Sequence, residues 1–332
     1  MKHEAAKNIV FVAGKSGGHI IPCATLAQDY NNHGYTTFFF TSNGTLDKKI
    51  IDSYSFLDRV IPLKINTETG FFKNILFIYY FLRTFIQSFK ELRTIRPEKV
   101  VSSGGSVGLP VCFAAWVLRI PVELYELNVV PGRAIKLLSK IATTTYVCFH
   151  ESKKFLPKAV YAPYPVRFTA QDVLSKTEAC KELGLDQDKK TVVVLGGSQG
   201  SQFINNLVVS WLKTNPEQHK NLQIFHQTGS KDLDGLKQAY SSLAVSAIIC
   251  DYTKEIQQVY SAADIILARA GAGTLFEILF FKKKALIIPL EGASTDHQVD
   301  NAYAMMQEYP EYFKVVRQSE ANATLLSQHI GV

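Results

Sequence analysis

The sequence predicts an α/β protein made of two doubly wound domains, each built on a parallel sheet, that face each other across a cleft. Short apolar strands alternate with helical periodicity in both halves of the chain, which is typical of parallel sheets covered by helices. Each half also has a glycine-rich turn directly after a strand, at 14–19 and at 196–200. The 332 residues, 47% hydrophobic and 20% charged, are enough for two separate cores.

The first half opens on a predicted strand at 8–13. The glycine loop that starts at Gly14 leads into a helix expected to run through about Asn32, and Gly34 ends it. Further strands are expected at 35–40, 57–62, 99–102, 121–125 and 143–148. Further helices are expected from the glycine turn at 103–106 through Leu118, and at 133–140. Each strand is followed by a turn and then by helical periodicity, as parallel pairing requires.

The second half is predicted to begin in the charged, proline-containing segment 163–188, which forms a linker and a first helix. The chain is therefore divided into domains at 1–162 and 163–332. The apolar, β-branched run 192–195 is typical of a strand covered on both faces. Further strands are expected at 222–225, 247–249, 264–267 and 285–289.

Net charge and cysteine usage restrict the partners and the compartment. The net charge of +7 favours an anionic partner, such as a nucleotide, a phosphorylated substrate, an acidic membrane surface or nucleic acid, without choosing among them. The five cysteines are far apart, which fits a reducing cytoplasm and argues against disulfide or zinc frameworks. The polar residues 1–7 are not expected to form a signal peptide. No histidine or carboxylate cluster has metal-ligand spacing, so no protein-held metal is expected.

Residues 70–96 are unusually aromatic for a helix with a solvated face. The uncharged run 74–82 is far shorter than the ~20 residues that a membrane-spanning helix needs. Aromatic rings flanked by lysine and arginine instead favour a helix that rests in an anionic interface. The alternative is a helix packed on the sheet, and both interpretations can hold on different faces. The expected membrane patch consists of Phe71, Phe72, Phe77, Tyr80, Phe81, Arg83 and Phe85.

Two nucleotide-binding motifs are excluded by their spacing. Residues 14–16 spell Gly-Lys-Ser, but the first glycine of a P-loop would fall on Ile9, inside a strand, so an ATPase is rejected. Neither glycine loop spells G-x-G-x-x-G, and the second strands end at 41–43 and 226–227 without an acidic ribose ligand. An NAD-dependent enzyme is therefore not expected, and no cofactor is predicted.

The two glycine loops have the chemistry of a phosphate site and of a base. Gly196, Gly197 and Gly200 let backbone N–H groups approach a phosphate at the start of a helix, and Ser198 adds a hydroxyl; the alternative is a tight turn without a ligand. His19 lies where the first loop becomes a helix. The helix dipole there favours a neutral imidazole, which is a candidate general base, although a solvated cap is the simpler interpretation.

Two further stretches suit a sugar nucleotide. Glu277 is placed about one turn into the helix that follows the glycine-bearing turn 269–273, where a carboxylate can accept both hydroxyls of a ribose. The alternative is a surface glutamate near a helix start. Residues 296–302 follow a predicted strand, and their amides and imidazole suit sugar hydroxyls.

Taken together, these motifs resemble those of the MurG family, over nearly the whole chain and in the family's order. The resemblance rests on 14–19, Gly104-Gly105, 126–128, 196–200, 269–277, and His297-Gln298 with Asn301-Ala302. It implies a GT-B fold of two Rossmann-like domains, with a lipid-linked acceptor in the N-terminal half and the donor in the C-terminal half. The implied enzyme moves GlcNAc from UDP-GlcNAc, with inversion, to the 4-hydroxyl of undecaprenyl-diphosphate-MurNAc-pentapeptide (lipid I to lipid II) in peptidoglycan synthesis. It would be peripheral on the cytoplasmic face of the inner membrane, with an anionic membrane surface and no nucleic acid as partner.

The resemblance also implies roles for single residues. His19 would deprotonate the acceptor hydroxyl. Ser198 and its loop would hold the donor diphosphate with Arg167 nearby, Glu277 would bind the ribose, and the backbone at Tyr252 and Thr253 would meet the uracil. The complete donor set is Ser16, Asn128, Arg167, Gly197, Ser198, Gln199, Tyr252, Thr253, Ala272, Gly273, Thr274, Glu277, His297 and Gln298. The acceptor diphosphate would contact Lys15, Gly17, Gly18, Gly104 and Gly105.

The chain departs from the family's pattern at Lys15, which replaces a glycine, at Leu127 and at Pro163-Tyr164. Residues 319–332 are a candidate for a shortened form of the family's terminal helix, which packs back on the first domain. Three alternative functions remain: a hydrolysing UDP-GlcNAc 2-epimerase, a non-catalytic membrane-bound UDP-sugar-binding subunit, and a transferase that uses diacylglycerol. The aromatic, basic helix would have no use in a soluble epimerase.

Overall fold

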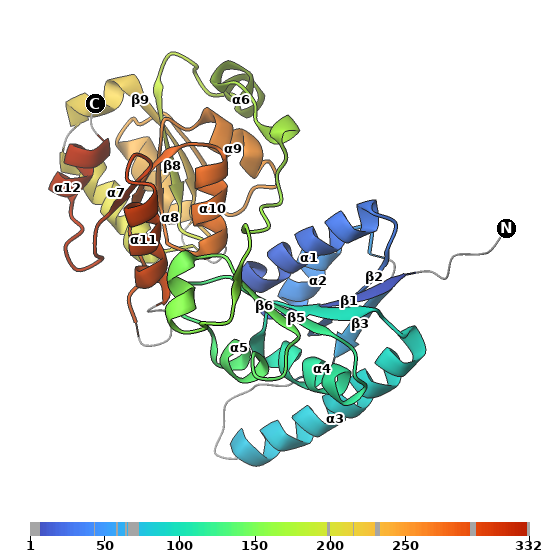
Figure 1. Ribbon diagram of the computed structural model, residues 1–332. Coiled ribbons are helices and arrows are strands. Elements are labelled where there is room, and N and C mark those ends of the chain that lie inside the picture. The colour runs from blue at the N-terminus through green and yellow to red at the C-terminus, as the bar shows by residue number, and fades with distance from the viewer. Residues whose placement is uncertain are drawn as a thin grey trace. The chain divides into compact units, whose positions relative to one another are not determined.

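The structure is a computed structural model that describes residues 7–42, 44–57, 59–63, 65, 73–197, 200–214, 216–229, 233–292 and 297–330. The chain forms two compact units, residues 1–167 and 168–332. The division falls slightly after the boundary expected at 162 and 163. Each unit is built on its own parallel sheet (Figure 1).

In the first unit, the described strands form a seven-stranded parallel sheet in the order β3-β2-β1-β4-β5-β6-β7. The strands are β1 (Asn8–Val12), β2 (Thr36–Ser42), β3 (Arg59–Leu63), β4 (Lys99–Ser102), β5 (Val122–Glu126), β6 (Thr144–Val147) and β7 (Val160–Tyr161). The helices are α1 (Gly17–Asn32), α2 (Thr45–Ile51), α3 (Lys73–Ile95), α4 (Gly105–Val117), α5 (Arg133–Leu138) and the 3-10 helix η1 (His150–Lys154). The predicted alternation of strands and helices is confirmed.

Both faces of this sheet are covered by helices. Successive strand side chains point to opposite faces, so alternate residues of β1 enter two different cores. Val10 and Val12 pack with residues of α3, α4 and α5, while Ile9 and Phe11 pack with residues of α1 and α2. Because β1 lies between β2 and β4, the strand order reverses between β1 and β4. In doubly wound sheets, ligands bind beyond the carboxyl ends of the strands at such a point.

In the second unit, the described strands form a six-stranded parallel sheet in the order β10-β9-β8-β11-β12-β13. The strands are β8 (Lys190–Leu195), β9 (Leu222–Gln227), β10 (Ala247–Cys250), β11 (Ile265–Ala268), β12 (Lys284–Ile287) and β13 (Phe313–Val315). The helices are η2 (Ala170–Asp172), α6 (Lys176–Leu183), α7 (Gln202–Thr214), η3 (Pro216–Asn221), α8 (Leu233–Ser242), α9 (Ile256–Ala262), α10 (Ala272–Phe280), α11 (His297–Glu308) and α12 (Ala323–Ile330). The strand order here reverses between β8 and β11.

The last helix, α12, packs on α7 of the second unit. Leu326 and Ile330 are buried in the core of this unit, and Trp211 Nε1 donates to Ser327 Oγ at 3.1 Å. The described part of the segment 319–332 thus contributes to the core of its own unit. Packing of this segment on the first domain stays a prediction.

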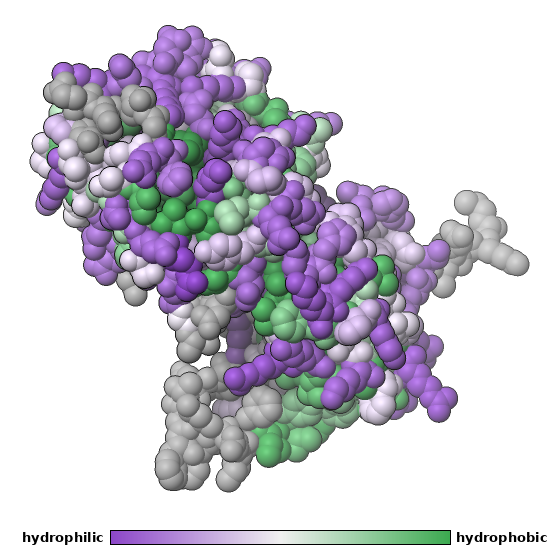
Figure 2. All heavy atoms as spheres, turned by 60° about the vertical axis from the view of Figure 1, so that its left-hand side comes forward, coloured by the Kyte–Doolittle hydropathy of each residue, from purple (hydrophilic) through white to green (hydrophobic). Residues whose placement is uncertain are grey.

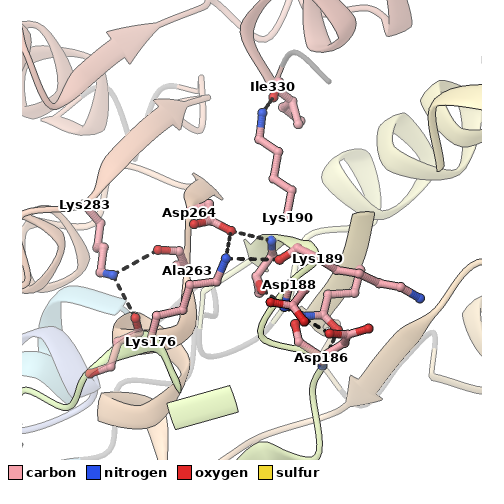
Figure 3. A network of polar contacts seen from close by, with 12 residues as sticks. Lys176, Asp186, Asp188, Lys189, Lys190, Ala263, Asp264, Lys283 and Ile330 are labelled. Carbon is pink, nitrogen blue, oxygen red and sulfur yellow. Dashed lines mark hydrogen bonds and ion pairs between the residues drawn. The ribbon is translucent and has the colours of Figure 1, made fainter. Parts of the chain in front are cut away.

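A polar network at the amino ends of β8 and β11 attaches α6 to the second sheet (Figure 3). Lys176 Nζ, on α6, donates to Asp264 Oδ2 at 2.7 Å and to the carbonyl of Lys189 at 3.1 Å. The same carboxylate oxygen accepts the backbone N–H of Thr191 at 2.7 Å. Lys283 Nζ donates to two backbone carbonyls at the end of α9. The network lies at the amino ends of the strands, at the edge of the sheet opposite the glycine loop. It therefore stabilises the packing of α6 and α9 on the sheet and has no part in the glycine loop.

Three elements, α2, β7 and β13, were not predicted from the sequence. The two strands contain only two and three residues and lie at the outer edges of their sheets. An edge strand has one neighbour and needs no long β-branched run, so its sequence carries little signal.

Candidate active site

In the first unit, two glycine turns meet at the carboxyl ends of β1 and β4. Ser103, which follows β4, donates its hydroxyl to the carbonyl of His19 at 3.3 Å. Gly17 and Gly18 open α1, and Gly104 is the N-cap of α4, which begins at the next residue. The structure therefore brings the predicted base to the same edge of the sheet as the glycines predicted for the acceptor diphosphate.

His19 lies in the first turn of α1 and is half-buried. Its backbone N–H donates to the carbonyl of Ser16, the N-cap residue, at 3.1 Å. The first turn of α1, all of which is described, carries no acidic side chain. No acidic side chain of this turn therefore opposes the positive end of the helix dipole. The role of His19 as a general base stays a prediction.

Lys15 has a backbone conformation that favours glycine, with a φ of 71°. Its backbone N–H donates to both carboxylate oxygens of Asp47, at 2.9 and 3.2 Å. This buried carboxylate also accepts the hydroxyls of Thr41 and Ser42, at 2.9 and 2.5 Å. Partial burial lowers the pKa of the Lys15 ammonium, and the Asp47 carboxylate opposes that shift. Asp47, which the sequence analysis did not single out, thus holds the first glycine loop against the end of β2.

Gly104 lies where a side chain has no room. Its φ is 85°, and an added Cβ would come 2.8 Å from the side chain of Ile135 on α5. Its backbone N–H donates to Ser102 Oγ at 3.0 Å. A residue with a side chain at this position would therefore push the turn between β4 and α4 away from α5.

The loop after β5 is built around the buried carboxylate of Glu126. Oε1 accepts the backbone N–H and the side-chain Nδ2 of Asn128, at 2.9 and 3.3 Å, and Oε2 accepts the N–H of Gly132 at 2.9 Å. Burial raises the pKa of Glu126, and these hydrogen bonds act in the opposite direction. Asn128, a predicted donor contact, is therefore fixed at the carboxyl end of β5. Leu127, one of the departures from the family's pattern, is buried.

In the second unit, a glycine loop joins β8 to α7. Gly197 and Gly200 have φ values of 88° and 74°, and the N–H of Gly200 donates to the carbonyl of Gly197 at 3.0 Å. An added Cβ on Gly200 would overlap the carbonyl of Thr228, which follows β9. The loop is therefore tightly packed between β8, β9 and α7. Ser198 and Gln199, both predicted donor contacts, lie outside the described residues.

Buried polar side chains hold the end of β9 beside this loop. Since the Asn205 carbonyl oxygen can only accept, His226 Nε2 donates to it at 3.1 Å, and Nδ1 accepts the Tyr240 hydroxyl at 2.8 Å. Asn205 Nδ2 donates to the carbonyl of Thr228 at 3.4 Å. Burial lowers the pKa of His226 to about 3, so the imidazole is neutral. These contacts join the first turn of α7 to the end of β9.

Arg269, directly after β11, is only 7% exposed. Its Nη1 donates to the carbonyls of Ile288 and Pro289 at 3.1 and 3.2 Å, while Nε and Nη2 both donate to Ser201 Oγ, at 3.1 and 2.7 Å. Burial lowers the pKa of Arg269 to about 10, and the Glu291 carboxylate opposes that shift. Arg269 was not predicted as a site residue beyond its place in a motif, because a sequence does not show that an arginine is buried.

α10 begins beside this arginine with the predicted donor residues Ala272, Gly273 and Thr274 in its first turn. Glu277, in the next turn, is buried, and its Oε2 accepts the Tyr260 hydroxyl at 2.8 Å. Glu277 is thus not a surface glutamate, and the hydroxyl orients its carboxylate. Binding of a ribose by Glu277 stays a prediction.

The other predicted donor residues lie on separate elements. His297 and Gln298 open α11, and Gln298 Oε1 accepts the backbone N–H of Leu290, beyond β12, at 3.1 Å. Tyr252 and Thr253 follow β10. Arg167 is half-buried and ends the first unit. Among the residues that the structure describes, no group of three or more His, Cys, Asp or Glu side chains is arranged to hold a metal ion.

α3 has an inner aromatic face. The rings of Phe81 and Phe113, on α4, lie 6.1 Å apart, and Phe85 packs against the core beneath α3. Phe81 and Phe85, both predicted for the membrane patch, are therefore half-buried, because they cover the sheet and α4. Tyr80 is also half-buried, and Arg83 is exposed. Phe71, Phe72 and the side chain of Phe77 lie outside the described residues.

α3 also has an outer apolar face. Ile78, Tyr79, Leu82 and Ile86 are 52–56% exposed. Trp116 and Val117, at the end of α4, are 52% and 51% exposed, and Trp116 contacts the ring of Phe113. We call these six side chains the α3–α4 patch. Figure 2 shows hydrophobic surface at the lower edge of the molecule, where Figure 1 places α3. Within the described part of the chain, no helix is long and apolar enough to cross a membrane.

Comparison with known proteins defines the class of this protein. Residues 9–147 match the N-terminal domain of glycosyltransferase family 28, and residues 191–331 match the C-terminal domain of the same family. Two Rossmann-like units, each with a glycine loop where its strand order reverses, agree with that class. The chain is therefore a family 28 glycosyltransferase of the predicted fold.

Individual relatives narrow the class further. A UDP-N-acetylglucosamine–N-acetylmuramyl-(pentapeptide) pyrophosphoryl-undecaprenol N-acetylglucosamine transferase from Carboxydothermus hydrogenoformans is 32% identical, over 90% of this chain and 81% of its own. The crystal structure of MurG from Acinetobacter baumannii matches with a TM-score of 0.74 at 21% identity, covering 97% of this chain and 89% of that chain. The chain belongs to the MurG family. A UDP-GlcNAc 2-epimerase from Neisseria meningitidis, bound to UDP-GlcNAc, shares the fold with a TM-score of 0.63 at 12% identity, covering 97% and 99% of the two chains.

Proposed function

We propose that this chain is an inverting N-acetylglucosaminyltransferase that moves GlcNAc from UDP-GlcNAc to undecaprenyl-diphosphate-MurNAc-pentapeptide, converting lipid I to lipid II in peptidoglycan synthesis. The observation that carries the proposal is the 32% identity, across both domains, to a transferase named for that reaction. Two diphosphates take part in this reaction, one on each substrate. The glycine turns of the two units supply one phosphate-binding loop for each of them.

His19 acts as the base in the proposed mechanism. Its neutral imidazole takes the proton of the acceptor 4-hydroxyl while that oxygen attacks the anomeric carbon of GlcNAc. The bond from the anomeric carbon to the UDP oxygen breaks on the opposite face, so the configuration inverts and UDP leaves. Backbone N–H groups at the starts of α7 and α10 stabilise the charge that develops on the diphosphate.

The proposed binding residues follow the chemistry of each ligand group. Glu277 binds the ribose, Arg167 and the loop with Ser198 and Gln199 bind the donor diphosphate, and the backbone at 252–253 meets the uracil. Asn128, His297 and Gln298 bind the sugar, with Ala272, Gly273, Thr274 and Ser16 close to it. Lys15, Gly17, Gly18, Gly104 and Gly105 receive the acceptor diphosphate.

The lipid-linked acceptor requires the enzyme to work at a membrane surface. The α3–α4 patch offers exposed aliphatic and aromatic side chains, and basic residues flank it on α3 at Arg83, Lys90 and Arg93. This combination suits peripheral attachment to the anionic cytoplasmic face of the inner membrane. The proposed membrane surface therefore includes the outer face of α3, and membrane contact by Phe81 and Phe85 stays a prediction.

The test of the proposed function is UDP release from UDP-GlcNAc by the purified chain, with and without a short-chain lipid I analogue. Release is expected only with the acceptor. His19→Ala should lower kcat by roughly 10² to 10⁴ while UDP affinity is kept, because general-base catalysis contributes a factor of that size. His33→Ala, at the other end of α1, is the matched control and should keep full activity.

Other outcomes would contradict the proposal. Conversion of UDP-GlcNAc to its 2-epimer without acceptor would identify an epimerase. UDP binding without turnover under any condition would identify a binding subunit. UDP release that depends on diacylglycerol and not on the lipid I analogue would identify diacylglycerol as the acceptor.

A further inference from the structure

Arg269 and Ser201 lie at the two turns that begin where β8 and β11 end. The backbone N–H of Arg269 donates to the carbonyl of Leu195, the last residue of β8, at 3.3 Å. Ser201 closes the glycine loop that leaves β8, and an added Cβ on Gly196 would come 2.6 Å from the Ser201 nitrogen. The Arg269 guanidinium therefore contacts Ser201 Oγ at the last residue of the glycine loop, directly before α7.

The positive charge of Arg269 is buried, and none of the described carboxylates forms a hydrogen bond or an ion pair with it. In the described chain, its acceptors are all neutral: Ser201 Oγ and the carbonyls of Ile288 and Pro289. Glu291, which acts on Arg269 electrostatically, forms an ion pair with Arg317 Nε at 2.6 Å. A buried charge is weakly screened, so Arg269 creates a positive potential at the base of the glycine loop. This potential favours an anion bound to the loop.

Arg269 also fixes the direction of the Ser201 hydroxyl. Ser201 Oγ accepts from Arg269 Nε and Nη2 and, at 3.4 Å, from the backbone N–H of Ile204. A hydroxyl oxygen has two lone pairs and one hydrogen. With its lone pairs turned to these donors, the hydroxyl keeps its hydrogen for a further acceptor. Ser201 is half-buried, so part of the residue is open to a ligand.

We propose that Ser201 donates a hydrogen bond to the diphosphate of a bound nucleoside diphosphate, and that Arg269 is the positioning residue that holds the hydroxyl in this orientation. This inference rests on the proposed function, since the diphosphate is that of the UDP-sugar. It assigns part of the diphosphate recognition to a side-chain pair from two different strand-to-helix turns. The planar guanidinium directs two N–H groups at the Ser201 oxygen and so fixes the orientation of the hydroxyl. A lysine ammonium is a point charge without this planar geometry and would orient the hydroxyl less well.

The first experiment compares uridine, UMP and UDP as ligands of the full chain by isothermal titration calorimetry. Ser201→Ala should weaken UDP binding about tenfold, the effect of losing one hydrogen bond to a charged group, and leave uridine binding unchanged. Ser201→Thr keeps the hydroxyl and should restore most of the UDP affinity. Ser210→Ala is the matched control, because Ser210 is an exposed serine on the same helix. It should bind all three ligands like the unmodified chain.

A double-mutant cycle then tests whether Arg269 acts through Ser201. Arg269→Lys keeps the charge but loses the fork, and should also weaken UDP binding about tenfold. In the Ser201→Ala background, the same change should have little further effect on UDP affinity, since the hydroxyl that it orients is gone. A thermal unfolding midpoint for each variant shows that it is folded, and Ser201→Ala keeps the test decisive if Arg269→Lys does not fold.

Three results would overturn the inference. Ser201→Ala could bind UDP as tightly as the unmodified chain, or it could lose uridine and UDP affinity equally, which would reveal a structural role only. The effects of the two substitutions on UDP affinity could also be additive, which would show that Arg269 does not act through Ser201. Each of these leaves acceptor-dependent UDP release intact, whereas failure of the unmodified chain to bind UDP would overturn the proposed function as well.

Discussion

Lys15 combines a strained backbone with a proposed binding role. A left-handed conformation costs a residue other than glycine roughly 1–2 kcal/mol, and Lys15 has a φ of 71°. Lys15→Gly is therefore expected to raise the free energy of unfolding by about 1 kcal/mol, measured by urea denaturation. It also removes the ammonium group proposed for the acceptor diphosphate. The KM for the lipid I analogue should rise roughly tenfold, while the KM for UDP-GlcNAc stays unchanged.

Lys282→Gly separates these two effects. Lys282 follows α10, is exposed and also has a positive φ, of 52°. Its replacement should stabilise the chain to a similar extent without changing either KM. An unchanged KM for the acceptor in Lys15→Gly would remove Lys15 from the proposed acceptor site.

His226 makes stability depend on pH. Its pKa is lowered by burial from 6.5 to about 3, so below pH 6.5 the unfolded chain binds a proton that the folded chain does not. The free energy of unfolding therefore falls as pH decreases toward 3, and this one group accounts for about 2 kcal/mol between pH 7 and 5. His226→Asn should be less stable at pH 7, because buried hydrogen bonds are lost.

The informative readout for His226 is the slope with pH, from urea denaturation at pH 7, 6 and 5. The variant should lose about 2 kcal/mol less than the unmodified chain over this range, since asparagine does not titrate. Equal slopes in the two proteins would contradict a neutral, buried His226. Burial keeps the His226 imidazole neutral, and its hydrogen bonds to Tyr240 and Asn205 fix the orientation of the ring.

At the scale of elements, α3 shows how one helix serves two surfaces. Its inner face packs through Phe85 and Phe89 into the core, and its outer face exposes Leu82 and Ile86. Replacing Leu82 and Ile86 with serine should weaken binding to vesicles that contain anionic phospholipid by at least roughly 100-fold, because each buried aliphatic side chain contributes about 1.5–3 kcal/mol. Sedimentation with vesicles measures this loss.

The control for α3 is an exposed valine elsewhere. Val160, on β7, is 51% exposed, and Val160→Ser should bind vesicles normally. Activity on a water-soluble acceptor analogue should be preserved in the α3 variant, since no proposed substrate contact is changed. Unchanged vesicle binding after the Leu82 and Ile86 replacements would show that the outer face of α3 is not the membrane-binding surface.

Elements with strong local signals were predicted correctly. The strand at 8–13, the helix through about Asn32 and the strand at 192–195 correspond to β1, α1 and β8, with small shifts at their ends. Each has an apolar run or a glycine boundary that is visible in the sequence. The packing of α12 could not be predicted from local patterns. Its burial depends on contact with α7, which lies more than one hundred residues earlier in the chain.

At the scale of the whole molecule, two parallel sheets were predicted and are confirmed, one in each unit. The alternation of strand and helix determines this architecture, since parallel strands need crossover helices and right-handed crossovers allow few arrangements. Each glycine loop was predicted directly after a strand, and therefore at the carboxyl end of that strand. In both units the described loops lie there.

The sequence by itself determined the fold class, the positions of the glycine turns and the family. Local patterns carry that information, because strand and helix periodicity, turn residues and motif order depend on neighbours along the chain. Only the tertiary structure decided which side chains support the loops: Asp47 beneath Lys15, and Arg269 on Ser201. These pairs join turns that follow different strands. Their contacts arise from sheet order, which no local pattern of residues encodes.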